Sequence, residues 1–72
     1  MDPKRTGKFI SDKRKKQGLS QKELAEKLNI TDKAVSKWER GLSFPDITML
    51  IPLSEILDIT LYDLLTGGSE DE

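Results

Sequence analysis

Apolar residues recur along most of the chain at spacings of three and four, and short polar or glycine-containing breaks separate these runs. That spacing is typical of α-helices with one buried face. It predicts five helices, at residues 6–17, 21–28, 32–40, 47–57 and 61–65. The positions expected to face inward are Phe9, Ile10, Leu24, Ala25, Leu28, Ala34, Val35, Trp38, Ile47, Leu50, Leu53, Ile56 and Leu57. No run alternates with the two-residue period of a strand, so we expect an all-α fold.

The breaks between the runs contain residues that begin and end helices. Ser20 with Glu23 three positions later forms a capping box before residues 21–28. Thr31, Asp46 and Thr60 stand where the three later helices need N-caps. Residues suited to the left-handed backbone at a helix end follow at Gly18, Asn29 and Gly41. Because caps and periodicity agree, the helix boundaries are well specified.

Pro52 is the one feature that conflicts with its predicted helix, residues 47–57. A proline has no backbone N–H, so it leaves the carbonyl four residues earlier, that of Thr48, without its helical partner. We therefore expect either a bend at this point or an unwound first turn.

The 72 residues allow one small domain with a modest core. The chain has no Cys and no His, which excludes thiolate and imidazole metal sites, disulfides, and Cys- or His-based catalysis. We therefore expect neither an enzyme nor a cofactor or metal. The sequence contains no membrane-spanning run and no signal peptide, so a cytoplasmic location is expected. Residues 67–72, which are Gly- and acid-rich, are predicted to be a flexible tail or linker after a domain at residues 1–66.

Charge is divided unevenly along the chain. All twelve Lys and Arg lie at residues 4–40, and with six acidic residues the segment 1–40 carries a net charge of +6. After Gly41 the chain has seven acidic residues and no basic one. The overall charge of −1 therefore hides a basic half, and a basic face is what attracts a polyanion. Two solvated faces of opposite sign would explain the same asymmetry, so charge alone leaves both interpretations open.

Residues 21–40 carry the pattern that bears on function. Two short helices are joined by a turn of about three residues, which makes them cross at a steep angle. Ala25 is small where the two helices approach. The apolar residues that they would share as a core are Leu24, Leu28, Ile30, Val35 and Trp38. The helix at 32–40 then turns polar side chains outward, and an exposed helix of this kind fits the major groove of DNA.

A set of short motifs at fixed spacing carries a family resemblance. They are Gly18-Leu19-Ser20-Gln21, Leu24-Ala25, Ile30-Thr31, Val35-Ser36, Trp38-Glu39, Gly41, Pro45, Ile59-Thr60-Leu61 and Leu64-Leu65. Over residues 7–65 the chain resembles the helix-turn-helix domains of the lambdoid phage repressors and Cro, the XRE family. Asn29 stands where that family more often has Gly. The resemblance implies a compact, five-helix, lambda-repressor-like DNA-binding domain.

The resemblance also implies roles for single residues. Gln21 would touch phosphate, with a base edge also in reach, and Arg40 would contact the DNA backbone past the third helix. The residues that would face the groove are Thr31, Asp32, Lys33, Ser36 and Lys37. The two lysines suit guanine O6 and N7 as donors, and Asp32 suits cytosine N4 as an acceptor or could orient a neighbour. Arg14 and Glu39 match a pair that forms a salt bridge between the first and third helices.

Several of these residues have a simpler alternative. Trp38 fits a core position better than a base-stacking role, because it lies at mid-helix spacing. Arg14 could contact phosphate instead of Glu39, although the salt bridge is favoured. Asp32 would stabilise a helix N-terminus in any case. The lysines of the first helix more often form a solvated surface than a specific site, and here they could add non-specific attraction to DNA; they are Lys13, Lys15 and Lys16.

Two kinds of function fit this sequence. The first is a sequence-specific DNA-binding transcription regulator, in this family often a repressor, that binds an inverted-repeat operator as a weak homodimer. The resemblance implies dimer contacts on the last helix, at Leu61, Tyr62 and Leu65. The second is a protein-interaction module, such as an antitoxin or a bridging coactivator, which would use the acidic part at residues 46–72. The sequence specifies neither the operator, nor the regulated genes, nor an effector.

Overall fold

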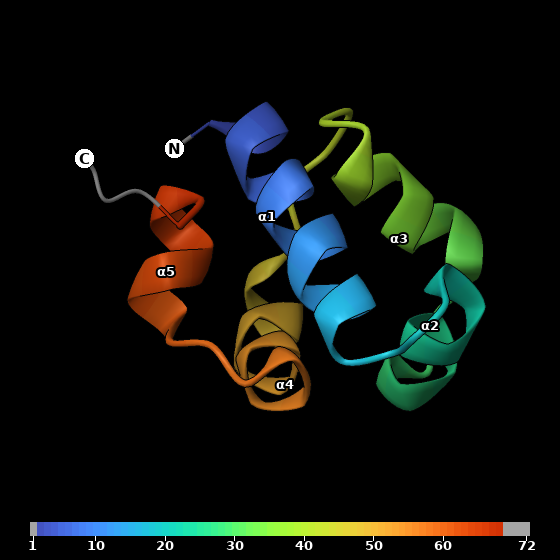
Figure 1. The fold of residues 1–72 in the computed structure, drawn as a ribbon. Helices are drawn as coiled ribbons and strands as arrows, with labels where there is room; N and C mark the ends of the chain where they lie inside the picture. The colour runs from blue at the N-terminus through green and yellow to red at the C-terminus, as the bar shows by residue number, and fades with distance from the viewer. Residues whose placement is uncertain (1, 69–72) are drawn as a thin grey trace.

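Five helices follow one another in the computed structural model, which describes residues 2–68 (Figure 1). They are α1 (Pro3–Lys16), α2 (Gln21–Leu28), α3 (Asp32–Glu39), α4 (Ile47–Leu57) and α5 (Leu61–Thr66). The all-α prediction and the number of helices are confirmed for this part of the chain. The predicted bounds of the second and fourth helices are those observed, the third helix ends one residue earlier, and the fifth ends one residue later.

The first helix begins three residues before the predicted start, because an N-cap was overlooked. The Asp2 carboxylate accepts hydrogen bonds from the backbone N–H of Lys4 at 3.0 Å and of Arg5 at 3.4 Å. Pro3 occupies the first helical position, where its missing N–H has no partner to lose. The polar residues ahead of the apolar pattern therefore form a helical turn without burying apolar surface.

The predicted caps at the other breaks are confirmed. Ser20 Oγ accepts from the Glu23 N–H at 3.0 Å while Glu23 Oε1 accepts from the Ser20 N–H at 2.8 Å, which completes the capping box. Thr31, Asp46 and Thr60 each accept a hydrogen bond from the first turn of their helix. Asn29 has the predicted left-handed conformation, with φ of 59°.

Pro52 does not unwind the start of α4. The Asp46 carboxylate accepts from the Thr48 N–H at 2.8 Å, and the Met49 N–H donates to the Asp46 carbonyl at 2.9 Å. The first turn is therefore closed, and helical structure continues across Pro52 to Leu57. The prediction of an unwound first turn is wrong because the cap holds that turn without the bond that proline removes.

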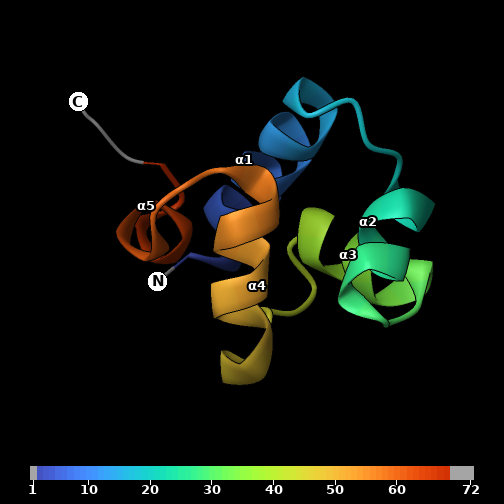
Figure 2. The ribbon, with the colours of Figure 1, turned by 90° about the horizontal axis from the view of Figure 1, so that it is seen from below.

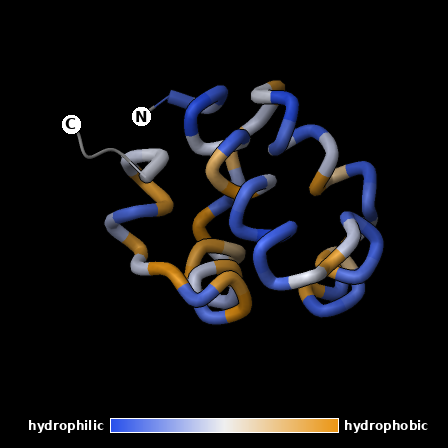
Figure 3. Tube along the Cα trace, viewed as in Figure 1, coloured by the Kyte–Doolittle hydropathy of each residue, from blue (hydrophilic) through white to orange (hydrophobic). Residues whose placement is uncertain are grey.

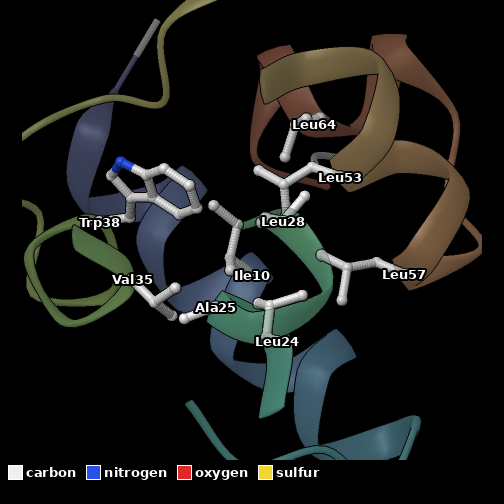
Figure 4. Packing of buried hydrophobic residues seen from close by; sticks show 9 residues of the cluster. All are labelled: Ile10, Leu24, Ala25, Leu28, Val35, Trp38, Leu53, Leu57 and Leu64. Atoms are coloured by element: carbon white, nitrogen blue, oxygen red, sulfur yellow. The ribbon is translucent and has the colours of Figure 1, made fainter. Parts of the chain in front are cut away.

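Nine side chains form one core that joins all five helices (Figure 4). They are Ile10, Leu24, Ala25, Leu28, Val35, Trp38, Leu53, Leu57 and Leu64. All of them except Leu64 were among the positions expected to face inward. Trp38 is 6% exposed, so its predicted core role is confirmed. Ile47 is 82% exposed and was placed wrongly, because the first turn of α4 extends past the other helices (Figure 2).

The first helix runs through the middle of the domain, with α3 on one side and α5 on the other (Figures 1 and 2). Gly7 allows the close approach of α3, because a Cβ atom at this position would lie 2.1 Å from the Trp38 carbonyl oxygen. On the other side, the buried Thr6 hydroxyl donates to the Leu64 carbonyl at 3.1 Å. The two flanking helices are thus fixed to α1 at adjacent residues.

The end of α5 is closed by two glycines. Gly67 has a left-handed conformation, and the Gly68 N–H donates to the Asp63 carbonyl at 2.8 Å. These first two residues of the predicted tail therefore complete the last helix, and the remainder of that tail, residues 69–72, lies outside the described residues. Across residues 2–68, we find no helix with both the length and the apolar character needed to cross a membrane.

Candidate nucleic-acid interface

The helices α2 and α3 are joined by a turn whose hydrogen bonds fix their relative orientation. The Asn29 N–H donates to the Glu26 carbonyl at 3.1 Å, and the Ile30 N–H donates to the Ala25 carbonyl at 3.0 Å. Ala25 is 2% exposed, which agrees with its predicted place where the helices approach. Val35 and Trp38 turn inward from α3, so the opposite side of that helix remains at the surface of the domain (Figure 4).

The outward side of α3 contains most of the residues that the sequence predicted. Positions 32, 33, 36, 37 and 40 share one face of a helix with 3.6 residues per turn. Asp32, Lys33, Lys37 and Arg40 are exposed, and Ser36 is half-buried. Thr31 is exposed at the start of the helix, where its hydroxyl oxygen accepts from the Ala34 N–H. We call the surface formed by Asp32, Lys33, Ser36, Lys37 and Arg40 the α3 face.

The charged groups of the α3 face are not paired with one another. Within residues 2–68 the ion pairs are Lys8 with Asp12 and Arg14 with Glu39, and neither involves α3-face residues. The Arg40 side chain turns back along its helix, with Nε 3.4 Å from the Ser36 carbonyl that it donates to. The ammonium groups of Lys33 and Lys37 therefore retain their full capacity to donate hydrogen bonds.

Behind the α3 face, a polar network ties three helices together. Arg14 on α1 donates from Nε to Glu39 Oε2 at 2.7 Å and from Nη2 to Oε1 at 2.9 Å. Its Nη1 donates to the Leu19 carbonyl at 2.8 Å, in the connection between α1 and α2. The predicted salt bridge is thereby observed, with both charged side chains nearly buried. The network holds the C-terminal end of α3 against α1.

Gln21 joins the same network. Its Nε2 atom donates to Glu39 Oε1 at 2.9 Å, and the residue is half-buried at the start of α2. Its predicted contact with DNA stays a prediction, and in the structure its amide nitrogen contacts Glu39 at the end of α3. Nothing in the sequence pattern indicates this bond, because residues 21 and 39 are brought together only by the crossing of α2 and α3.

The network also sets the charge state of Glu39. Burial raises the pKa of the Glu39 carboxyl, but hydrogen bonds from Arg14 and Gln21 lower it by more, so the pKa lies below its ordinary value. The pKa of Arg14 is raised further, chiefly by its hydrogen bonds to Glu39. Both groups are therefore charged at neutral pH, and the Glu39 carboxylate at the end of α3 is paired with the Arg14 guanidinium of α1.

The helices differ in hydropathy. The traces of α1, α2 and α3 are mainly hydrophilic, whereas that of α4 is mainly hydrophobic and that of α5 is mixed (Figure 3). The lysines at the C-terminal end of α1, Lys15 and Lys16, are exposed, and so is Lys22 on α2. All the basic residues belong to residues 4–40, the segment that includes the α3 face.

The fold and the paired helices define a helix-turn-helix domain, and comparison with known proteins agrees. A family model described as Helix-turn-helix matches residues 10–64. The chain is 41% identical over 64 residues to the HTH-type transcriptional regulator ImmR of Bacillus subtilis (strain 168), covering 89% of this chain and 50% of ImmR. It is 37% identical over 67 residues to the HTH-type transcriptional regulator SinR of the same organism, covering 92% of this chain and 60% of SinR. The chain thus belongs to the helix-turn-helix family of XRE type.

A solved structure supports the fold independently. The clp gene regulator ClgR from C. glutamicum superimposes with a TM-score of 0.81 at 22% identity, covering 94% of this chain and 87% of that one. The lambda-repressor-like five-helix architecture is therefore confirmed. The chain spans half to three-fifths of the length of the two curated relatives. Both are named as transcription regulators, which agrees with the expectation that this chain is not an enzyme.

Proposed function

We propose that this domain binds double-stranded DNA in a sequence-specific way and thereby regulates transcription, with α3 in the major groove. The observation that carries the proposal is the position of Lys33 and Lys37, which belong to neither ion pair of residues 2–68, on the exposed polar side of α3 in the helix-turn-helix pair. An α-helix with its side chains is about 10–12 Å across, and the major groove is about 12 Å wide. Cations within such a groove meet phosphates on both sides and base edges at the floor.

Phosphate contacts are proposed for the residues that flank α3. Arg40 lies at its C-terminal end and is exposed, so it can reach the DNA backbone beyond the groove. Gln21 lies at the first position of α2, where its backbone N–H points out of the helix N-terminus and suits a phosphate oxygen. Thr31 retains its hydroxyl proton for the same purpose.

We further propose that the regulator acts as a repressor on an inverted repeat, as a homodimer that forms through α5. Tyr62 is 71% exposed and Leu61 is 41% exposed, while Leu65 is half-buried next to them. Because α5 lies on the opposite side of α1 from α3, contacts between copies at α5 leave the α3 face open (Figure 1). Half-sites about one helical turn apart are expected for such a dimer.

Footprinting of genomic fragments followed by gel-shift titration tests the DNA proposal. Specific binding should protect one discrete site, and the affinity should fall steeply between 50 and 200 mM salt, as it does for proteins that neutralise several phosphates, roughly a hundredfold or more. Equal affinity for unrelated fragments, or affinity that does not change with salt, would show that the domain does not act in this way.

A reporter with the protected site placed across its promoter then tests repression. Expression of the regulator should lower transcription from that promoter and leave a promoter with a scrambled site unchanged. Increased transcription from the intact site would identify an activator instead.

A further inference from the structure

If the domain reads DNA as proposed above, the chemistry of its α3 face constrains which bases it prefers. We infer that the half-site contains two G·C pairs two base pairs apart, with Lys33 and Lys37 donating to the two guanines and Asp32 accepting from the cytosine paired with the first. This inference rests on the proposed function and adds the identity of the bases.

The first step is the arrangement of the α3 face in two rows. Residues four apart are neighbours on a helix, so Lys33 and Lys37 form one row, and Asp32 and Ser36 form the adjacent one. Four residues span about 6 Å of helix axis, and two base-pair steps span nearly the same length at about 3.4 Å each. A row of two lysines along the groove therefore meets bases two steps apart.

The second step is the donor and acceptor inventory of each row. A lysine ammonium can only donate, and guanine offers two acceptors, N7 and O6, at the edge of the groove. An aspartate carboxylate can only accept, and cytosine offers the N4 amino group as its single polar contact. Asp32 is exposed and belongs to neither of the ion pairs within residues 2–68, so its oxygens are free for this contact. Since Asp32 and Lys33 are adjacent, they suit the two bases of a single G·C pair.

The third step excludes an adenine preference, and it depends on the structure. Adenine presents an acceptor, N7, beside a donor, N6, and reading both at once takes an amide that donates and accepts, as in Asn or Gln. The α3 face has no such residue, and Gln21, the amide predicted to touch DNA, already donates from Nε2 to Glu39 Oε1 at 2.9 Å. Glu39 is held there by Arg14, so Gln21 would have to abandon a nearly buried carboxylate to turn toward a base.

A preference for thymine is disfavoured when the groups that thymine presents are compared with those of the α3 face. Its distinguishing group is the C5 methyl, which is read by apolar contact. None of the five α3-face residues carries a methyl or aromatic group, and the exposed methyl of Thr31 lies outside that face. The exposed large hydrophobic residues among residues 2–68, which are Leu42, Ile47, Ile51, Leu61 and Tyr62, also lie outside α3. The α3 face therefore provides hydrogen-bonding groups that match guanine and cytosine and lacks the apolar contacts that thymine needs.

Selection from a random duplex library with the 72-residue protein, followed by sequencing, tests the inference. Enriched half-sites should contain guanines at two positions of one strand separated by one free position. Labelled duplexes in which each guanine is replaced by 7-deazaguanine, which lacks N7 but still pairs with cytosine, then address single atoms. Each replacement should weaken binding about fivefold or more, the lower end of what one base contact contributes.

The lysine variants assign each guanine. For the Lys33→Ala variant, 7-deazaguanine at one of the two guanine positions should no longer weaken binding, while 7-deazaguanine at the other position should weaken it as before. The Lys37→Ala variant should show the reverse. Lys27→Ala removes the same charge from α2, outside the α3 face, and should keep both sensitivities. Enriched sites with A·T at either lysine position, or 7-deazaguanine without effect, would overturn the inference while leaving specific DNA binding intact. A library without enrichment would instead overturn the proposed function.

Discussion

The two halves of this domain share one core but present opposite surfaces. Residues 2–40 contain every basic residue, and the five exposed large hydrophobic side chains within residues 2–68 all follow Gly41. The first half is held together in part by a buried polar network. By contrast, α4 and α5 join it mainly through leucines, with hydrogen bonds from Thr6 to the Leu64 carbonyl and from Gln17 to the Leu57 carbonyl. The difference agrees with the proposed functions, in which the first half binds a polyanion and the second half supports it and contacts a second copy of the domain.

The largest effect is expected where the second half enters the shared core. Leu53 on α4 is fully buried, so Leu53→Ala should lower the free energy of unfolding by about 2–5 kcal/mol. Ile51, two residues earlier, is 60% exposed, and Ile51→Ala should change the free energy of unfolding by less than about 0.5 kcal/mol. Urea denaturation followed by the fluorescence of Trp38 measures both. Similar losses for the two variants would show that α4 is not divided into a core side and a solvent side.

Local sequence patterns predicted most of this fold because interactions among neighbouring residues determine where each helix begins and ends. The Ser20–Glu23 box and the left-handed Asn29 fix the bounds of α2 through bonds to near neighbours. Once α3 was placed, its period decided that Val35 and Trp38 point inward and that the residues between them point out. The candidate site was therefore predictable wherever it depends on helix phase.

What the sequence did not reveal depends on helices meeting in space. Gly7 matters only because the Trp38 carbonyl lies against it. Ile47 matches the helical period of α4 but is exposed, because periodicity does not say how far the partner helices extend. The bond between Gln21 and Glu39 likewise requires the observed crossing angle. The Arg14–Glu39 bridge was expected only through the family resemblance.

A somewhat smaller loss is expected from the polar network of the first half. Glu39→Gln keeps the shape of the side chain but leaves the Arg14 guanidinium without its carboxylate, which should destabilise the domain by about 2 kcal/mol at pH 7. The same urea titration measures this loss. A variant as stable as the original would mean that the first half does not depend on its buried ion pair.

The Glu39→Gln variant should also change how the stability of the domain depends on pH. The pKa of Glu39 is lowered in the folded state, so unfolding takes up a proton once the pH falls below the ordinary carboxyl value of about 4.3. The stabilisation from Glu39 is therefore complete above that pH and is lost as the pH falls through the lower folded value. Glu39→Gln should flatten this part of the stability curve. Some acid dependence should remain, because hydrogen bonds from Thr48 also lower the pKa of Asp46.

Within the first half, the lysines should differ in how they affect DNA binding. Lys37→Ala on the α3 face should weaken binding to the protected site by about 1–3 kcal/mol, and it should weaken binding to unrelated duplexes much less. Lys16→Ala, at the end of α1, should weaken all duplexes alike and reduce the slope of log affinity against log salt by about 0.9. Fluorescence anisotropy at several salt concentrations separates the two. Equal behaviour of the variants would indicate that α3 contributes charge without reading bases.

The smallest effect is expected on the apolar surface of the second half, which offers two alternative sites for contact between copies. Tyr62→Asp on α5 introduces a carboxylate into the proposed dimer surface and should weaken binding to the inverted repeat roughly fivefold, about 1 kcal/mol, without changing binding to an isolated half-site. Ile47→Asp places the same charge on α4, at an even more exposed position, and should leave both affinities unchanged. Titration of the full repeat and of the half-site, each followed by anisotropy, measures the difference. A weakened repeat with Ile47→Asp but not with Tyr62→Asp would move the dimer contact from α5 to α4, and the second half would still be the one that meets protein.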